Sequence, residues 1–193
     1  MRTLAVIEFV TLDGVMQGLG SPNEDRDGGF EYGGWGAPYG DEVLATRAAE
    51  GQRATTAYLF GRKTYETMAA RWPSEPAGNP IADHLNATPK YVATNTLASL
   101  DWERSHVLDG DVVASVEDLK RQGTGGIAVL GSHLLAQTLI EQRLVDECRL
   151  LVHPLLLGTG KRLFNAMRSP LALRLIECTP TTTGVLMLSY RPA

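Results

Sequence analysis

Two glycine-containing segments combine the residue types that proteins use to hold phosphate groups. One reads Gly-Arg-Lys-Thr at residues 61–64, the other reads Gly-Ser at residues 131–132, and each follows a short apolar run. A glycine at the end of a parallel strand allows a tight turn and a close approach of ligand to backbone, while the following helix N-terminus offers unpaired N–H groups to an anion. Arg62 and Lys63 place two cations at such a helix start, where they oppose the helix dipole unless an anion is bound. The two segments therefore predict a phosphate site.

A third loop with small polar side chains follows another apolar segment. The sequence Thr-Asn-Thr at residues 94–96 comes at the end of an expected strand, Lys90–Thr94. Ligands of open α/β sheets bind outside the carboxyl ends of the strands. We therefore expect this loop to meet the two glycine segments at one edge of a sheet and to form a nucleotide cleft with them.

The pattern of apolar residues predicts an α/β fold with a mixed, mostly parallel sheet covered by helices on both faces. The first segment, Leu4–Leu12, shows little alternation and is expected to be a central strand that is buried on both faces. The other expected strands are Ala57–Phe60, Lys90–Thr94, Ile127–Leu130, Glu147–His153, Ala172–Cys178 and Gly184–Arg191. The expected helices are Asp41–Arg53 with Asp41 as N-cap, Tyr65–Ala70, a helix that opens at the capping box 115–118 and runs to Gln122, and Ser132–Arg143.

Three stretches are expected to lack regular structure. Gly18–Gly40 is rich in glycine and also carries four aromatic residues, which a solvated linker would not need. A loop of this length in a compact domain is usually functional. The prolines between Trp72 and Ile81 are expected to exclude regular structure there, and Asp109-Gly110 indicates a tight turn between two apolar pairs.

The composition is that of one globular domain, residues 1–193. The hydrophobic fraction is 44% and the charged fraction 21%, both ordinary for a packed core with a solvated surface. The net charge is -4, with acids and bases interspersed, so there is no electrostatic footprint for nucleic acid or an anionic membrane. We expect a small-molecule substrate as the partner.

The cysteines, the histidines and the N-terminus indicate a cytoplasmic protein without a metal. Cys148 and Cys178 lie far apart in apolar stretches, which favours buried thiols in neighbouring strands over a disulfide or a metal pair. The four histidines have no spacing that suits a metal site. Glu8 interrupts the apolar N-terminal run, which therefore predicts a strand and not a signal peptide.

Taken together, the motifs resemble the dihydrofolate reductase-like superfamily. Residues 60–66, FGRKTYE, resemble the MGRxT[WY]E segment of dihydrofolate reductases, and residues 144–158, LVDECRLLVHPLLLG, resemble a late signature of the reductase domain of the bifunctional riboflavin-biosynthesis deaminase/reductase and its stand-alone relatives. The similarity spans nearly the whole chain. It implies a three-layer αβα fold and an NADPH-dependent reductase. The acceptor would be a C=N or C=O group of a small pterin-, pyrimidine- or sugar-like molecule, such as 5-amino-6-(5-phosphoribosylamino)uracil.

The resemblance also assigns cofactor residues by position. Residues 61–64 would bind the pyrophosphate and the 2′-phosphate, which favours NADP(H) over NAD(H) because Arg and Lys suit a dianionic phosphate. The turn at residues 12–16 would edge the nicotinamide. The residues assigned to the cofactor are Gly61, Arg62, Lys63, Thr64, Thr94, Asn95, Gly131, Ser132, His133, Leu134 and Leu135.

Three carboxyl groups are candidates for orienting water or supplying a proton to the acceptor. Asp13 precedes a glycine, so the sequence fits a turn residue as well as it fits a functional carboxyl group. Asp41 is also the expected helix N-cap. Glu8 lies in an apolar strand, where a carboxylate needs a partner or a raised pKa. On the substrate side we expect Met16, Trp35 and Tyr39, with the two aromatic residues forming a lid over a planar substrate or merely pinning the long loop.

The chain departs from both reductase families at two positions. The acid that dihydrofolate reductases place within the helix before the GRxT strand is confined here to the helix start, and Leu130 stands where the riboflavin reductase has a glutamate. A dihydrofolate reductase and a non-catalytic nucleotide-binding module therefore stay open as alternatives. The resemblance also implies a homodimer, for which the apolar segments 155–157 and 185–188 would serve if they are not buried strands.

Overall fold

The computed structural model describes residues 1–97, 99–108, 110–164 and 167–193. The strands are β1 (Thr3–Thr11), β2 (Thr55–Gly61), β3 (Lys90–Ala93), β4 (Ser105–Leu108), β5 (Gly126–Leu130), β6 (Glu147–His153), β7 (Leu173–Pro180) and β8 (Leu186–Pro192). The α-helices are α1 (Glu42–Ala54), α2 (Arg62–Arg71), α3 (Pro80–Ala87), α4 (Val112–Arg121) and α5 (His133–Glu141), with short 3₁₀ turns at Asp27–Gly29, Ala37–Tyr39 and Trp72–Ser74.

The contacts divide the chain into two compact units. The first contains Met1–Val6 and Ala48–Asp146, and the second contains Ile7–Arg47 and Glu147–Ala193. The chain passes between them within β1 and within α1, so neither unit is a continuous stretch of sequence. That residues 1–193 act as a single reductase-like domain stays a prediction.

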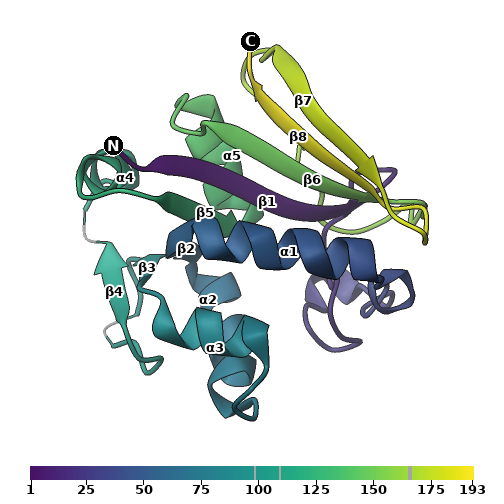
Figure 1. Ribbon diagram of the computed structural model, residues 1–193, viewed down its shortest axis with the longest axis horizontal. Coiled ribbons are helices and arrows are strands. Elements are labelled where there is room, and N and C mark those ends of the chain that lie inside the picture. Colours follow the sequence, from purple (N-terminus) through teal and green to yellow (C-terminus); the bar gives the residue numbers. More distant parts are fainter. Residues whose placement is uncertain (98, 109, 165–166) are drawn as a thin grey trace. The chain divides into compact units, whose positions relative to one another are not determined.

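The first unit is built on parallel strands in the order β4-β3-β2-β5, followed by the beginning of β1 (Figure 1). The register pairs Phe60 of β2 with Val92 of β3, and Leu59 of β2 with Val129 of β5. These four side chains are fully buried, because the strands are covered on both faces. Since the strands are parallel, their carboxyl ends and the residues that follow them lie at the same edge of the sheet.

The second unit continues the strand order with the remainder of β1, then β6, β8 and β7. β8 pairs antiparallel with both β6 and β7, and Leu150 of β6 lies opposite Leu188 of β8. The described residues therefore contain a mixed eight-stranded sheet, and the expected α/β class with its mixed, mostly parallel sheet is confirmed.

Strand β1 differs from the expectation of burial on both faces. Leu4, Val6, Glu8 and Val10 are buried, whereas the alternate residues from Thr3 to Phe9 on the other face are half-buried or exposed. The alternation is therefore present in burial although it is weak in residue type. Because Glu8 lies on the buried face, the one charged residue of this strand is also one of its least exposed.

Two expectations about helices were wrong. Pro80 does not exclude regular structure but occupies the first turn of α3, where its missing N–H costs nothing, and Asn79 caps that helix. The capping box at 115–118 lies inside α4, which begins at Val112 because Asp111 is its N-cap. The expected tight turn includes Asp109, which lies outside the described residues.

The two cysteines also differ from their expectation. Cys148 in β6 is buried, but Cys178 in β7 is exposed. Their strands are not neighbours, because β8 lies between them. Both thiols are free, and desolvation raises the pKa of the Cys148 thiol to about 11, so it is inert as a nucleophile at neutral pH.

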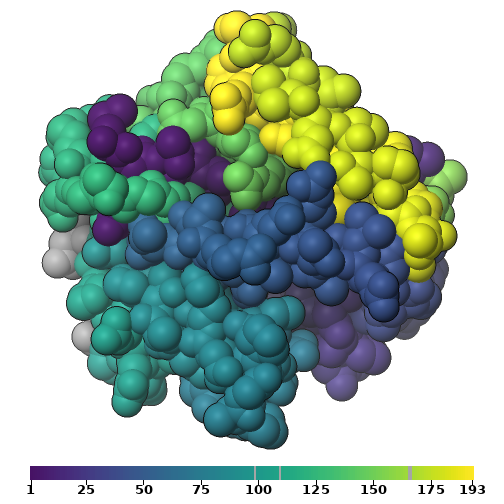
Figure 2. Space-filling model, viewed as in Figure 1, coloured from purple at the N-terminus to yellow at the C-terminus, as the bar shows by residue number. Residues whose placement is uncertain are grey.

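Helix α1 differs from the other described α-helices, each of which has at least one buried residue. None of its residues is buried, and its side chains are visible on the surface in Figure 2. Asp41 begins it as expected, since its Oδ1 accepts the N–H of Leu44 at 2.8 Å. None of the helices in the described part of the chain is long and apolar enough to cross a membrane.

Candidate nucleotide cleft and reductase site

The first unit brings three of the predicted loops to one place. A cleft of about 590 Å³ lies at the carboxyl ends of the parallel strands. Five of the residues assigned to the cofactor line it, from the starts of two helices and the loop after β3: Arg62, Thr94, Asn95, Leu134 and Leu135. Its volume falls in the range of pockets that hold cofactors. The carboxyl ends of the parallel strands therefore meet at a concave surface, as expected from the sequence.

The two glycine segments touch each other directly. The N–H of Gly61 donates to Ser132 Oγ at 2.9 Å, which joins the end of β2 to the end of β5. A Cβ on Gly131 would lie 3.3 Å from Thr64 Cγ2, and its φ of +60° is one that other residues rarely adopt. Four more of the assigned residues therefore form one packed group at the head of the two helices.

The helices that begin at these glycines lack the caps that the other helices have. Asp41, Asn79 and Asp111 cap α1, α3 and α4 with their side chains. By contrast, α2 begins at Gly61 and α5 at Ser132 without a side-chain cap. A helix without a side-chain cap keeps its first N–H groups for water or for a ligand anion.

The remaining assigned residues lie in the first turns of the same helices. Lys63 follows Arg62 in α2, where its carbonyl oxygen accepts the Thr67 hydroxyl, and His133 opens α5. The helix therefore starts earlier than the expected Tyr65, because the strand runs into it without an intervening loop. Arg62 Nη1 pairs with Glu66, at 3.2 and 3.1 Å from its two carboxylate oxygens.

Asp13 acts as an anchor for a loop. Its carboxylate accepts the Thr11 hydroxyl at 2.6 Å and the backbone N–H groups of Leu157 and Gly158. These hydrogen bonds, with that of Thr11 the strongest, lower the pKa of Asp13 to about 2. Arg162 adds a donor from its guanidinium at 3.4 Å. The carboxylate is therefore ionised and engaged, which does not suit a proton donor.

Asp41 is likewise engaged as a cap. One oxygen accepts the N–H of Leu44, and the other accepts the N–H and hydroxyl of Thr182 at 2.6 and 2.8 Å. These hydrogen bonds lower the pKa of Asp41, led by that of the Leu44 N–H. The geometry therefore favours a role for Asp41 as the N-cap of α1.

Glu8 differs from the two aspartates in its burial, its hydrogen bonding and the direction of its pKa shift. Its side chain is buried, and among the described residues Oε1 has no hydrogen-bond partner. Desolvation raises the pKa of Glu8 well above its ordinary value. It is the one member of the three carboxyl candidates in which burial favours the neutral form of the side chain over the ionised form.

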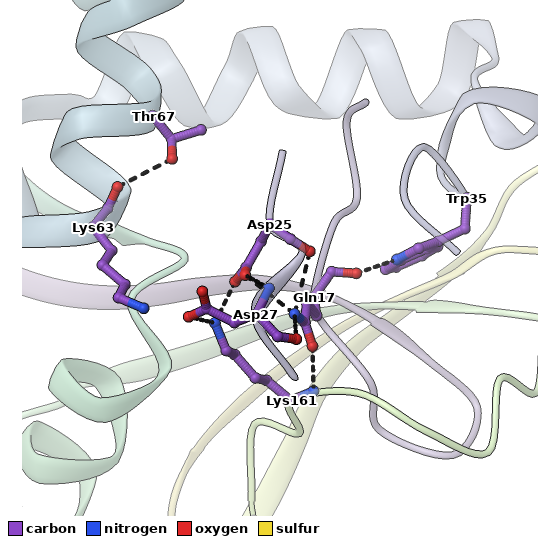
Figure 3. A network of polar contacts seen from close by, with 7 residues as sticks. All are labelled: Gln17, Asp25, Asp27, Trp35, Lys63, Thr67 and Lys161. Atoms are coloured by element: carbon purple, nitrogen blue, oxygen red, sulfur yellow. Dashed lines mark hydrogen bonds and ion pairs between the residues drawn. The ribbon is translucent and has the colours of Figure 1, made fainter. Parts of the chain in front are cut away.

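The residues assigned to the substrate lie in the second unit with different exposures. Trp35 is buried in a cluster with Val15 and Phe30, and its indole N–H donates to the carbonyl of Gln17 (Figure 3). Trp35 therefore anchors the long loop, and its burial does not support the hypothesis that it forms a lid over the substrate. Met16 and Tyr39 are half-buried.

The sequence reasoning missed several residues that the structure places at these sites. Thr96, Asp111 and Thr138 also line the cleft. His153, read as a sheet-end residue, is buried with ring centroids 5.0 Å from Trp35 and 5.2 Å from Tyr39. Neighbours of known cleft residues, such as Thr96 beside Asn95, could have been included from the sequence, whereas the packing of a ring could not.

A second network holds the long loop to the segment after β6. Lys161 Nζ lies 2.5 Å from Asp25 and 2.8 Å from Asp27, and Gln17 joins the same group (Figure 3). Oppositely charged side chains thus fix a loop whose regular structure is limited to the short 3₁₀ turns Asp27–Gly29 and Ala37–Tyr39. Among the described residues, no group of three or more His, Cys, Asp or Glu side chains could hold a metal ion.

Parallel strands that end at a nucleotide-sized cleft, continued by an antiparallel pair, define a dihydrofolate reductase-like α/β protein. Within that class, the RibD C-terminal domain family matches residues 2–187, and the chain belongs to this family. Membership supports an oxidoreductase of the riboflavin-pathway reductase type.

Individual relatives agree with this placement. The uncharacterized protein YyaP of Bacillus subtilis (strain 168) is 27% identical over 135 residues, which are 68% of this chain and 71% of that protein. A putative riboflavin biosynthesis protein from Shewanella sp. PV-4 has a similar structure, with a TM-score of 0.73 at 18% identity, over 100% of this chain and 99% of that one. A dihydrofolate reductase from Enterococcus faecalis, solved with NADP(H), gives a TM-score of 0.61 at 14% identity, over 98% and 96% of the two chains.

Proposed function

We propose that the protein is an NADPH-dependent reductase that transfers hydride to a C=N or C=O group of a small pterin-, pyrimidine- or sugar-like acceptor. The observation that carries this proposal is the cleft at the ends of the parallel strands of the first unit, lined by Arg62, Thr94 and Asn95. Family membership adds the reductase chemistry, and the likeness to a dihydrofolate reductase solved with NADP(H) supports a nicotinamide cofactor.

The residues around the cleft suit a phosphorylated dinucleotide. Gly61 and Gly131 allow the two segments to pack closely, because a Cβ on either would face Ser132 or Thr64, and the helices that follow lack side-chain caps that would compete with a pyrophosphate. The guanidinium of Arg62 is suited to a dianionic 2′-phosphate. The cofactor would supply the hydride, while the protein supplies orientation and shields the transfer from water.

Glu8 is the residue that we propose as the source of the proton. Reduction of a C=N or C=O bond consumes one hydride and one proton, and a carboxyl group donates a proton only if its pKa is raised. Asp13 and Asp41 have lowered pKa values, whereas burial raises that of Glu8.

The two alternatives make different demands on the same residues. A dihydrofolate reductase would need an acid within α1 to bind the pterin, and α1 carries the exposed Glu50 in addition to Asp41 and Glu42 at its start. A non-catalytic nucleotide-binding module would need the cleft alone. The engagement of Asp13 and Asp41 in structural hydrogen bonds favours this module more than it favours the dihydrofolate reductase.

Nucleotide binding followed by turnover tests the proposal. The wild-type protein would be titrated with NADPH and with NADH while cofactor fluorescence is recorded, and then mixed with pterins and ribosylaminopyrimidines while the loss of NADPH absorbance is followed. We expect NADPH to bind and at least one acceptor to be reduced. Tight NADPH binding without turnover of any acceptor would favour the binding module, and no binding of either nucleotide would overturn both readings.

The 2′-phosphate assignment has its own test. The double variant Arg62→Ala with Lys63→Ala is expected to weaken NADPH binding by about tenfold or more, as expected for loss of charge-assisted hydrogen bonds, and to change NADH binding much less. Arg71→Ala, at the far end of the same helix, is the matched control because its guanidinium pairs with Glu75. An equal loss of affinity for both nucleotides would show that these residues do not read the 2′-phosphate.

We also propose a cytoplasmic homodimer. Leu186 of the expected apolar segment 185–188 is 39% exposed, and the neighbouring strand β7 exposes Leu175 and Ile176. Exposed apolar residues on adjacent strands are typical of a surface that binds a partner. Light scattering after gel filtration measures the mass directly, and a monomer at micromolar concentration would exclude the dimer.

A further inference from the structure

The antiparallel strands of the second unit have one face without charged side chains at its paired positions. Residues that lie opposite each other in antiparallel strands point to the same side of the sheet, so the register of β6, β8 and β7 assigns each residue to a face. Two rows that cross all three strands on one side are Leu150, Leu188 and Cys178, and Cys148, Tyr190 and Leu175. Val152 and Leu186 belong to the next row. We call this side the apolar face.

The opposite face of the same strands is charged and occupied. One of its rows consists of Arg149, Ser189 and Glu177. Arg47 of α1 forms an ion pair with Glu177, with 2.5 Å between Nη2 and Oε1. At the end of β6, the buried ring of His153 packs against aromatic rings of the long loop. Within the second unit, α1 and the long loop therefore contact the charged face and not the apolar one.

The apolar face is only partly covered in a single chain. Leu175 is 50% exposed, Leu186 is 39% exposed and Cys178 is also exposed, while Leu188 and Tyr190 of the central strand are half-buried. Three strands of this length span roughly 14 Å by 23 Å, on the order of 300 Å² of flat sheet. Contiguous apolar patches of that size on soluble proteins mark surfaces that bind another molecule.

The free edge of β7 is unsuited to pairing with a further strand, although β7 is the last strand in the order (Figure 1). Leu175 and Glu177 pair with consecutive residues of β8, so Ile176 is an extra residue in β7. Such a bulge bends an edge strand, and Pro180 at the end of β7 offers no N–H. A partner would therefore bind the face of these strands and would not extend the sheet.

A second copy of the chain is the partner that suits this face. In a twofold symmetric contact the same patch of both copies meets, so charges near the axis face charges of the same sign. The apolar face has none at its paired positions, whereas the opposite face has Arg149, Arg174 and Arg191. Apolar sheet faces pack about 10 Å apart with their strands nearly aligned. Two copies can therefore bury their apolar faces against each other as the two layers of a β-sandwich.

We propose that the apolar face of β6, β8 and β7 binds the same face of a second copy, so that Leu175, Leu188 and Tyr190 become buried between two sheets. This inference rests on the proposed homodimer and specifies its interface, and it does not depend on the proposed reductase activity. A standard interface buries about 800 Å² on each partner. The apolar face therefore forms the core of the interface, and neighbouring exposed side chains such as Ile176 complete its rim.

Two glutamate substitutions on the face and one outside it test the interface. Leu175→Glu and Leu186→Glu place an unpaired charge in the contact, and the fold should tolerate both because these side chains are exposed in the single chain. Since each substitution occurs twice in a symmetric dimer, we expect the dimer dissociation constant to rise by about a hundredfold or more.

Leu156→Glu is the matched control for these variants. Leu156 is 68% exposed and lies in the loop after β6, outside the paired strands, so this variant should stay dimeric. Light scattering after gel filtration, over a range of protein concentrations, measures the mass of each variant. An unchanged circular dichroism spectrum shows that each variant is folded.

Thiol labelling gives an independent readout of the same face. Cys178 is exposed and lies in the row of Leu188, whereas Cys148 is buried, so a maleimide labels Cys178. The wild-type dimer should react at least about tenfold more slowly than the monomeric Leu175→Glu variant, and its rate should rise on dilution. Cys178→Ser is the control, which should abolish the labelling.

Two results would overturn this inference while the homodimer stands. In one, the variants on the apolar face stay dimeric, or they dissociate no more readily than Leu156→Glu. In the other, Cys178 of the wild-type dimer reacts as fast as that of the Leu175→Glu monomer. A wild-type protein that is monomeric at micromolar concentration would overturn the homodimer and this inference together, and would leave the proposed reductase activity untouched.

Discussion

The Oδ2 atom of Asp13 lies 2.8 Å from the backbone nitrogen of Gly158, so the turn after β1 is hydrogen-bonded to the loop after β6. Arg162 strengthens the contact, because its Nε donates to the carbonyl oxygen of Asp13 at 3.0 Å. Met16 lies within the same turn, and its N–H donates to Lys161. The turn that the resemblance places beside the nicotinamide is therefore fixed by the second unit's own residues.

Replacement of Asp13 by asparagine should weaken this contact. We expect Asp13→Asn to lower the free energy of unfolding by about 2 kcal/mol at pH 7, because the ionised acceptor of two backbone N–H groups is lost. Urea denaturation measures the change. Glu24→Gln is a suitable control, since its carboxylate accepts only exposed N–H groups of the long loop.

The same contact predicts an acid dependence. The folded pKa of Asp13 is about 2, below its ordinary value of 3.8, so its contribution is present above pH 3.8 and is lost as the pH falls toward 2. Asp13→Asn should therefore differ from the wild type less at pH 2 than at pH 7. A difference that does not depend on pH would show that the carboxylate charge is not involved.

Lys161 should control the order of the long loop. We expect Lys161→Met to increase amide hydrogen exchange and protease cleavage within Gly18–Gly40, because Asp25 and Asp27 lose their shared cation. Global stability should change by less than about 1 kcal/mol, as is usual for partly exposed ion pairs. Arg121→Met, which removes ion pairs within α4, should leave the loop unchanged. Unaltered exchange in Lys161→Met would mean that the buried aromatic residues alone hold the loop.

Glu8 should make the protein less stable as the pH rises. Its folded pKa is raised above the ordinary 4.5, so the neutral side chain is tolerated below that pH and the cost of ionisation grows as the pH rises toward the folded pKa. We expect the melting temperature of Glu8→Gln to vary less between pH 5 and pH 8 than that of the wild type. Parallel curves for the two proteins would indicate that Glu8 is ionised in a site that stabilises its charge, and would exclude it as a proton donor.

The position of the cleft at the ends of the parallel strands could be predicted from the sequence better than the roles of the acids. The motif at residues 61–64 and the loop after β3 are local patterns, and parallel strand ends must meet, so Arg62, Thr94 and Asn95 could be placed together from the sequence. The hydrogen bond from Gly61 to Ser132 was not predictable, because it depends on a left-handed backbone that serine rarely adopts. The positions of Gly61 and Ser132 in their motifs assigned both residues to the cofactor, but did not predict that they are hydrogen-bonded to each other.

The roles of the acids depended on partners that lie far away in the sequence. Besides the local partners Thr11 and Leu44, Asp13 and Asp41 have partners 145 and 141 residues later, at Gly158 and Thr182. No short sequence pattern predicts a contact between residues so far apart in the chain. Trp35 shows the same limit, because a ring in a glycine-rich loop suggests a lid until its burial with Phe30 is known.

Asp111 gives the last prediction, which concerns the choice between NADPH and NADH. Its side chain lines the cleft with Arg62, and one of its oxygens caps α4 by accepting the N–H of Ala114. A carboxylate there opposes a 2′-phosphate, so Asp111→Asn should tighten NADPH binding by about fivefold, equivalent to roughly 1 kcal/mol of repulsion near the surface. NADH, which lacks this phosphate, should bind nearly as before.

Asparagine is an equally good N-cap, so the helix should keep its stability. Asp118→Asn, on the same helix but paired with Arg121 and outside the cleft, is the matched control and should bind both nucleotides unchanged. Fluorescence titration of the three proteins decides the matter, and a weaker NADPH complex in Asp111→Asn would show that this carboxylate binds the nucleotide and does not repel it.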